Sequence, residues 1–438
     1  MKINMDALII DGGGKVGYSA MRSLARLGLR VAVADDVRVG MGQWSRFCHG
    51  KYLFEHPYTH AEAFMDNVVR ILKDSGAKFL LPAQNGTEVL ARYRYRLPDG
   101  VVLPLASYEQ IRMANDKSLM AAYARSVGVN VPEVIEWKTW DELENNLKAI
   151  DYRVVVKLRC GYNSKWVYYP DDVGGALTLC RDLTVKYSLE PDQLPIVQRW
   201  VEGEKWIVAC LYHEGRKLAL FNHRLLRQTP ATGGVGTLRV SARHEEMEEY
   251  ATKILNSLGW HGIAAVEFKY DPASGKMWFI EINPRLWGSI SLAVASGVDL
   301  VALQYVASTE GPGRAMAIAR PQINGVVGRW WLGDAKLAAS EAKRLRPLKA
   351  LKLLLPGGTD VYDEFRGDDL GATAGTVSRL AIGFLHCMKR KCEGGKEVES
   401  PYLDMDSTDG HKNNGTQDNG RHRWAERGDD IDKGREAA

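Results

Sequence analysis

The sequence has few cysteines and no long apolar run. Its six cysteines are spread over 438 residues without a Cys-x-x-Cys pair, so their spacing argues against a disulfide framework or a zinc site. No apolar stretch approaches the roughly 20 residues that a membrane-spanning helix needs. The first apolar run is followed at once by glycines, which is typical of a β-strand and not of a signal peptide. We therefore expect a cytoplasmic protein.

An excess of one charge is also missing. The chain has 58 basic and 54 acidic residues, a net charge of +4, and this balance makes nucleic acid an improbable main partner. Hydrophobic residues make up 45% and charged residues 26% of the chain, as in ordinary globular proteins. The length suits roughly two to four domains.

Two strands with alternating polarity carry the densest group of polar residues. They flank a turn at 271–276, and folding them as a hairpin sets Glu267 opposite Glu281. Because side chains alternate along a strand, Glu281, Asn283 and Arg285 then share one face. Facing carboxylates repel unless a cation neutralises them, and an oxygen cluster of this kind suits Mg²⁺. The alternative is a charged face that only meets water.

Two lysines precede this hairpin. Lys157 ends a run of valines on a strand that must be largely buried, so its ammonium needs an anionic partner. Lys117 follows Asn115 and Asp116, which can cap a helix whose N-terminus favours an anion. Taken singly, each lysine is more often a surface side chain, and their order relative to the hairpin is what favours phosphate binding.

Over roughly residues 5–307 these motifs, in this order, resemble the ATP-grasp superfamily, including amino-acid ligases and carbamoyl-phosphate-synthase-like proteins. The resemblance implies that Lys117 and Lys157 hold the ATP phosphates. It also implies that Glu267, Glu281 and Asn283 bind Mg²⁺ or Mn²⁺.

Further roles follow from the same resemblance. The hinge at 198–204 would meet adenine through the backbone of Arg199, Trp200 and Val201, and ribose through Glu204 or its rival Glu202. The lid loop at 160–166 has one glycine and bulky neighbours, which predicts a stiffer lid than many relatives have, or one adapted to its substrate. The remaining assignments are Gln198 in the hinge, Ser164 and Lys165 in the lid near phosphate, and Arg285 with Arg224 or Arg227 near the acidic substrate or acyl phosphate.

The predicted fold class combines α/β and α+β architecture. We expect a pre-ATP-grasp α/β domain at 1–114, followed by a two-lobed ATP-grasp fold. Its N-terminal lobe with the lid would span 115–195, and its C-terminal lobe with the metal site 196–330. A small helical region would occupy 331–391, and a polar, disordered tail 392–438.

Two other readings compete with this one. Gly12, Gly14 and Gly17 match G-x-G-x-x-G after a strand and Asp35 ends the next strand, so an NAD(P)-dependent oxidoreductase is formally indicated. That fingerprint does not account for the lysines or the carboxylate hairpin. Leucines interleaved with basic residues at 345–355 are typical of a helix on anionic lipid, but a helical subdomain packed on the core is favoured.

The sequence thus predicts an ATP-dependent ligase of the acid–amino acid type. It would activate a small-molecule carboxylate as an acyl phosphate and join it to an amine, releasing ADP and phosphate. An ATP-grasp enzyme with a non-amine acceptor is the nearest alternative. A homodimer is compatible with the sequence.

Overall fold

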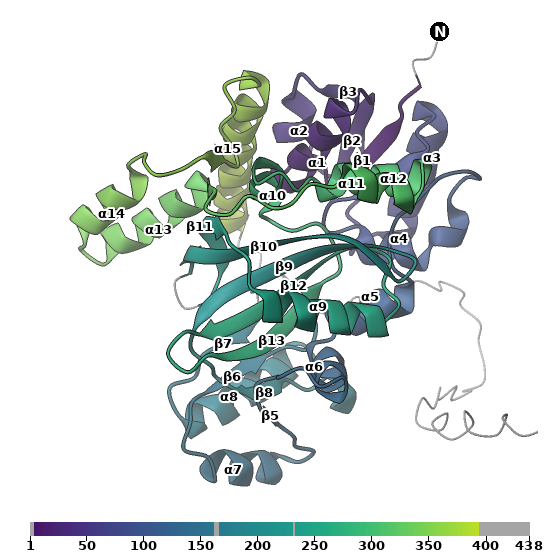
Figure 1. The fold of residues 1–438 in the computed structure, drawn as a ribbon. Helices are drawn as coiled ribbons and strands as arrows, with labels where there is room; N and C mark the ends of the chain where they lie inside the picture. Colours follow the sequence, from purple (N-terminus) through teal and green to yellow (C-terminus); the bar gives the residue numbers. More distant parts are fainter. Residues whose placement is uncertain (1–3, 162–165, 231–232, 394–438) are drawn as a thin grey trace, which may run out of the picture. The chain divides into compact units, whose positions relative to one another are not determined.

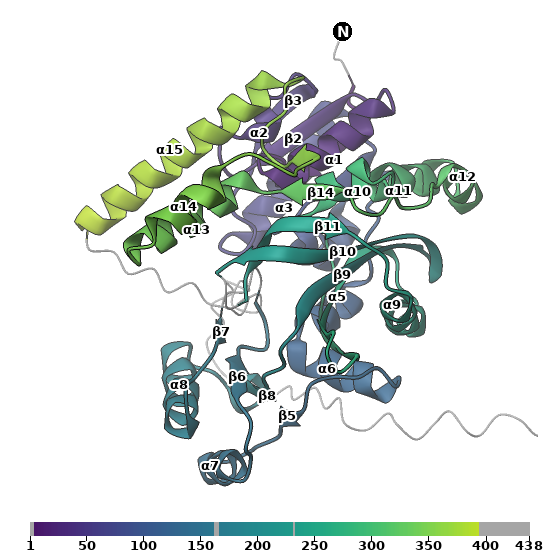
Figure 2. The ribbon, with the colours of Figure 1, turned by 60° about the vertical axis from the view of Figure 1, so that its left-hand side comes forward.

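The structure, a computed structural model, describes residues 4–161, 166–230 and 233–393 (Figures 1 and 2). The predicted tail falls almost entirely outside these residues. Parallel and antiparallel sheets occur in the same chain, so the predicted mixture of α/β and α+β architecture is confirmed. The described cysteines Cys48, Cys160, Cys180 and Cys210 are free.

The N-terminal part is a parallel sheet of four strands in the order β3-β2-β1-β4. Its central strands are fully buried, as expected when helices cover both faces of a parallel sheet. The strands are β1 (Ala7–Ile10), β2 (Val31–Asp35), β3 (Cys48–Leu53) and β4 (Phe79–Pro82), and the main helices are α1 (Lys15–Arg26) and α3 (Ala61–Ser75).

A second sheet, in the order β5-β8-β6-β7, is antiparallel and has a small core of its own. The predicted domain boundary at 196 falls at the start of β8, which pairs with β6 in this sheet. The strands are β5 (Val134–Ile135), β6 (Val154–Lys157), β7 (Val167–Tyr168) and β8 (Ile196–Arg199), with α6 (Lys117–Ser126), α7 (Trp140–Lys148) and α8 (Val173–Lys186) in the same stretch of chain.

The largest sheet has seven strands in the order β13-β12-β9-β10-β11-β14-β15. All of its neighbouring strands except the β14–β15 pair run antiparallel, in agreement with the predicted hairpins. The strands are β9 (Glu204–His213), β10 (Arg216–Thr229), β11 (Val235–Ser241), β12 (Gly262–Asp271), β13 (Lys276–Asn283), β14 (Val327–Arg329) and β15 (Val361–Tyr362), and α9 (Glu245–Ser257) contacts β9 and β10.

One long apolar helix expected at 290–307 is in fact two helices, α10 (Ile290–Ala295) and α11 (Leu300–Thr309). Gly297 adopts a φ of +87° between them. Glycine takes this left-handed conformation without steric strain, and it commonly ends a helix there. The side chain of Asp299 then accepts a hydrogen bond from the Ala302 amide and starts α11. The apolar character continues through the break, which is why periodicity alone did not reveal it.

The C-terminal helices are α13 (Trp331–Lys343), α14 (Pro347–Leu354) and α15 (Leu370–Glu393). Leucines of this region were expected to be core residues, and that expectation was wrong for most of them. Leu345 is 89% and Leu348 76% exposed, whereas Leu353 is only 7% exposed. No helix among the described residues is long and apolar enough to cross a membrane.

Helix α15 returns to the N-terminal sheet and contacts α2 (Met41–Trp44). Its Arg379 Nη1 lies 3.0 Å from Asp35 Oδ1, while Asp35 Oδ2 accepts a 2.7 Å hydrogen bond from the Gly13 amide. A Cβ atom on Gly13 would lie 2.3 Å from Arg379 Nη1. The carboxylate that a dinucleotide ribose would need is therefore already satisfied by the protein, and the glycine-rich turn packs against an arginine.

Asp334, near the start of α13, ties that helix to the large sheet. It is fully buried and accepts hydrogen bonds from Arg227 Nε at 2.7 Å and from Arg329 Nε at 2.7 Å. Removing one partner of a buried ion pair leaves uncompensated charge in a medium of low polarity. Here one carboxylate, that of Asp334, is the acidic partner of two guanidinium groups, those of Arg227 and Arg329.

We therefore predict that Asp334→Asn lowers the free energy of unfolding by about 3–5 kcal/mol. Urea unfolding measures this change, from the midpoint and the m-value. Asp74→Asn is the matched control, because Asp74 is an exposed partner of Arg70 on a helix surface and should cost less than about 1 kcal/mol. Equal midpoints for the two variants would contradict the proposed tie.

Candidate active site

A row of side chains crosses the large sheet on one face. Glu281 on β13 is paired directly with Glu267 on β12, as predicted from the hairpin. Glu267 is paired in turn with Ile207 on β9, and Ile207 with His223 on β10. Directly opposed residues of an antiparallel sheet point to the same face. Both carboxylates therefore lie on the face of the sheet that also carries Ile207 and His223.

Glu267 is 8% exposed and has a cationic neighbour. Its Oε2 atom lies 2.5 Å from Lys205 Nζ, and its Oε1 atom accepts a 3.1 Å hydrogen bond from Asn283 Nδ2. Burial raises the pKa of Glu267, and the nearby Glu281 raises it further, whereas Lys205 lowers it. Burial lowers the pKa of Lys205, but the two carboxylates outweigh burial and the net shift is upward.

Glu281 connects the large sheet to the start of α6. Its Oε2 atom lies 3.7 Å from Lys117 Nζ, which also donates a 3.1 Å hydrogen bond to the carbonyl of Gly161. Burial alone would raise the pKa of Glu281, but Lys117, Lys205 and Lys157 together lower it. Glu281 is thus held as a carboxylate by three ammonium groups.

Lys157, at the end of β6, is buried at 8% exposure, as the run of valines predicted. Its Nζ atom donates a 2.8 Å hydrogen bond to Gln198 Oε1 on β8, and the Gln198 amide donates to the Pro132 carbonyl. Gln198 is neutral, so this contact orients the ammonium without neutralising it. Burial lowers the pKa of Lys157 to about 8, with further lowering from Lys117 and Lys205.

The cluster has more positive than negative groups. Arg285 joins it through a 3.0 Å hydrogen bond from Nη2 to Asn283 Oδ1 and lowers the pKa of both glutamates. Four cationic side chains therefore surround two carboxylates, a surplus of two positive charges when all are ionised. The cations are Lys117, Lys157, Lys205 and Arg285. A surplus of this size in a buried site favours a polyanionic ligand.

Sequence reasoning missed Lys205. A signal for it was available, because alternation along β9 puts Lys205 on the face of Ile207 and hence of Glu267. Its identification needed the pairing of β9 with β12, two strands separated by the whole of β10, β11 and α9. That long-range pairing was not predicted.

The hinge residues lie where β8 leaves the small sheet. Arg199 and Trp200 donate their backbone amides to the carbonyls of Glu133 and Arg153, so these two amides are already used by the protein. Val201 is buried and Glu202 is exposed. Of the predicted hinge residues, Gln198 contacts the lysine cluster directly, through Lys157.

The two arginines of β10 are not brought to the cluster. Arg224 pairs with Glu204 at 2.8 Å, and it lies opposite Trp206, which alternation turns away from Lys205 and Ile207. Arg227 is occupied by Asp334. The predicted lid residues Ser164 and Lys165 lie outside the described residues.

The oxygen atoms of the candidate metal-binding residues are few, which suits a metal ion that also has ligands from a bound nucleotide. No group of three or more His, Cys, Asp or Glu side chains suited to a metal ion occurs in the described part of the chain. Glu267, Glu281 and the amide of Asn283 offer only a few oxygen ligands, whereas Mg²⁺ takes six and usually obtains several from phosphates and water. These residues therefore fit a metal bound together with a nucleotide.

Comparison with known proteins agrees with this geometry. Residues 114–289 match the family described as the ATP-grasp domain. The chain is 21% identical over 294 residues to the carbamoyl phosphate synthase large chain of Campylobacter jejuni, covering 63% of this chain and 26% of that protein. The chain thus spans about a quarter or less of the length of the curated relatives it matches.

Solved structures share the fold. One is the biotin carboxylase domain dimer of Hydrogenobacter thermophilus 2-oxoglutarate carboxylase with MgADP, ADP and bicarbonate, with TM-score 0.57, 15% identity and coverage of 74% of each chain. Another is the L-amino acid ligase of Bacillus licheniformis, with TM-score 0.54, 18% identity and coverage of 70% of this chain and 75% of that one. Residues 114–289 of this chain are thus similar to the ATP-grasp domain, and the wider fold is similar to that of these solved structures.

Proposed function

We propose that the chain is an ATP-dependent ligase that activates a small carboxylic acid as an acyl phosphate and transfers the acyl group to an amine. The ATP-grasp family uses ATP and Mg²⁺ and includes ligases that form C–N bonds. The observation that supports the proposal most is the buried surplus of positive charge around Glu267 and Glu281. A triphosphate supplies the negative charge that this surplus needs.

Lys117 and Lys157 would hold the phosphates of ATP. Both ammonium groups lie beside the carboxylates, and neither is fully neutralised: Lys117 is 3.7 Å from Glu281, and Lys157 contacts an uncharged amide. Their positions are fixed before any ligand binds, which reduces the reorganisation needed during phosphoryl transfer. The hinge beyond β8 is the proposed contact for adenine, with Glu202 or Glu204 nearest to the ribose.

Glu267, Glu281 and Asn283 would hold Mg²⁺, which would neutralise charge on the phosphate oxygens. The chain's own residues prepare this arrangement. Lys205 keeps Glu267 oriented. Asn283 turns its Nδ2 atom to the glutamates and its Oδ1 atom to Arg285, so its amide would have to rotate to offer the metal an oxygen. Arg285 also leaves a fixed guanidinium group beside the carboxylates that can bind a phosphate or carboxylate oxygen.

The reaction needs no nucleophilic side chain. A carboxylate oxygen of the substrate attacks the γ-phosphorus and ADP leaves; the amine nitrogen then attacks the acyl carbon, the C–O bond to phosphate breaks, and the amine proton is released. Each step depends on orientation and on charge neutralisation by the lysines, Arg285 and the metal. Arg224 and Arg227 are given no role in the acyl transfer, because Arg224 is paired with the ribose candidate Glu204 and Arg227 with Asp334.

Glu281→Gln tests the metal-binding role. The substitution keeps the size of the side chain but removes a charge and weakens oxygen coordination. We predict that phosphate release from ATP, with pooled carboxylic acids and amines, falls about a hundredfold or more. Glu310→Gln is the control, since Glu310 pairs with Arg314 on the surface, and it should keep full activity. Full turnover in Glu281→Gln would contradict the proposal.

The same variant should be less stable without ligands. Lys117, Lys157 and Lys205 all lower the pKa of Glu281, so they lose a stabilising counter-charge when it is removed, at a cost of about 1–3 kcal/mol. Repulsion between the facing glutamates alone predicts the opposite sign. Thermal or urea unfolding of the unliganded variant distinguishes the two: a gain in stability would show that repulsion dominates.

If Lys157 binds a phosphate of ATP, the affinity for Mg-ATP should depend on pH. The groups that face it are Lys117, Lys205, Glu267 and Glu281, and its pKa is lowered to about 8. Phosphate binds the protonated form, so affinity should be constant below about pH 7 and weaken up to about tenfold per pH unit above about pH 8. Calorimetry measures this dependence. Lys157→Met should bind weakly at all pH values without the slope, and a flat wild-type profile would contradict the assignment.

A further inference from the structure

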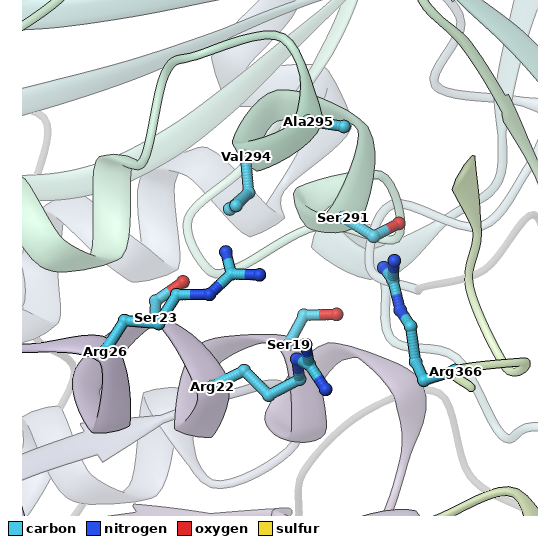
Figure 3. A pocket seen from close by; sticks show the side chains of 8 residues that line it. All are labelled: Ser19, Arg22, Ser23, Arg26, Ser291, Val294, Ala295 and Arg366. Atoms are coloured by element: carbon cyan, nitrogen blue, oxygen red, sulfur yellow. The ribbon is translucent and has the colours of Figure 1, made fainter. Parts of the chain in front are cut away.

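A second group of cationic side chains lies away from the lysine cluster. It lines a cavity of about 180 Å³ between α1, α10 and the segment after β15 (Figure 3). The polar side chains of the lining are three arginines and three serines, and the other two residues are apolar. The polar set is Ser19, Arg22, Ser23, Arg26, Ser291 and Arg366.

The cavity has an unbalanced positive charge. Arg22 is neutralised by Asp368, whose Oδ2 atom lies 2.7 Å from Arg22 Nη2. Arg26 and Arg366 form no salt bridge among the described residues, and the buried Nε atom of Arg366 has no hydrogen-bond partner there. Asp299 acts on Arg26 and Asp363 on Arg366 without a direct salt bridge, so three arginines line the cavity with one direct ion pair among them, a local excess of positive charge.

The geometry of these groups suits one anion. Figure 3 shows the Arg26 and Arg366 guanidinium groups reaching into the space between α1 and α10 from opposite sides, with the Ser291 hydroxyl beside Arg366. Burial and the charges of Arg22 and Arg26 lower the pKa of Arg366, and they outweigh the opposing effect of Asp363. The guanidinium groups would be stabilised by an anion between them, since they donate charge-assisted hydrogen bonds to phosphate oxygens.

The size of the cavity limits the ligand. A volume of about 180 Å³ corresponds to about six water molecules at roughly 30 Å³ each. This accommodates a phosphate group and a short substituent, but it is below the roughly 300 Å³ at which pockets for larger ligands begin. A whole nucleotide is larger than this space, and the arginines match the charge of a phosphate group.

We propose that this cavity is a binding site for a phosphate group, either free phosphate or a small phosphate monoester, separate from the nucleotide site. Ser291 links the two regions of the protein. Its hydroxyl donates a hydrogen bond to Asp363, which also pairs with Lys15 and Arg239. The Arg239 guanidinium in turn donates to the carbonyl of Gly288, in the segment that follows Asn283 and Arg285.

The test is calorimetric titration of the full chain with inorganic phosphate, glycerol phosphate and sulfate at constant ionic strength. We expect saturable phosphate binding to the wild type that weakens at least about tenfold in Arg26→Gln and in Arg366→Gln, as loss of a charge-assisted contact predicts. Arg314→Gln removes a surface arginine paired with Glu310 and should bind normally. Preference for the monoester or for free phosphate identifies the source of the ligand, and saturable binding of either supports the site.

The melting temperature of Arg366→Gln and phosphate binding by Lys157→Gln are measured in addition. Unliganded Arg366→Gln should melt at or above the wild-type temperature, because burial and the like charges of Arg22 and Arg26 oppose the charge of Arg366 more than Asp363 favours it. Lys157→Gln should still bind phosphate, since Lys157 belongs to the nucleotide site. The proposal is overturned if the wild type does not bind phosphate, if Arg366→Gln binds it normally, or if only Lys157→Gln abolishes binding.

Discussion

The buried balance of charge around Glu267 and Glu281 is the constraint on which the rest of this structure depends. Two carboxylates on adjacent strands are tolerable only because Lys117, Lys205 and Arg285 neutralise them from different elements. The same cations overshoot neutrality, and Lys157 adds a charge whose contact is a neutral amide. The cluster therefore carries an excess of positive charge, which the proposed nucleotide triphosphate with its metal would neutralise.

The charge cluster joins two of the three sheets. Lys157 comes from the small antiparallel sheet and both glutamates from the large sheet, so the site forms only when the two meet. The N-terminal parallel sheet is held by α15, through Arg379 and Asp35, and by Lys15, which pairs with Asp363 after β15. The glycine-rich turn consequently serves packing between N-terminal and C-terminal segments, and its dinucleotide fingerprint has a structural explanation.

The sequence predicted those parts of the site that depend on local rules. The Glu267–Glu281 register follows from the turn at 271–276 and the period of a strand, and the burial of Lys157 follows from its valines. It did not predict Lys205, which needs a pairing between distant strands, or the pairing of Arg227 with Asp334. The break at Gly297 and the exposed leucines Leu345 and Leu348 were also missed, because periodicity indicates an apolar face but not what covers it.

The most direct test of the account is a crystal structure of the chain with Mg²⁺ and a non-hydrolysable ATP analogue. The account predicts phosphate oxygens within hydrogen-bonding distance of Lys117 Nζ and Lys157 Nζ, a metal ion on Glu267 and Glu281, and adenine beside the hinge at 199–201. A nucleotide bound instead at the glycine-rich turn beside Asp35, or a cluster in which Lys157 still contacts only Gln198, would contradict it.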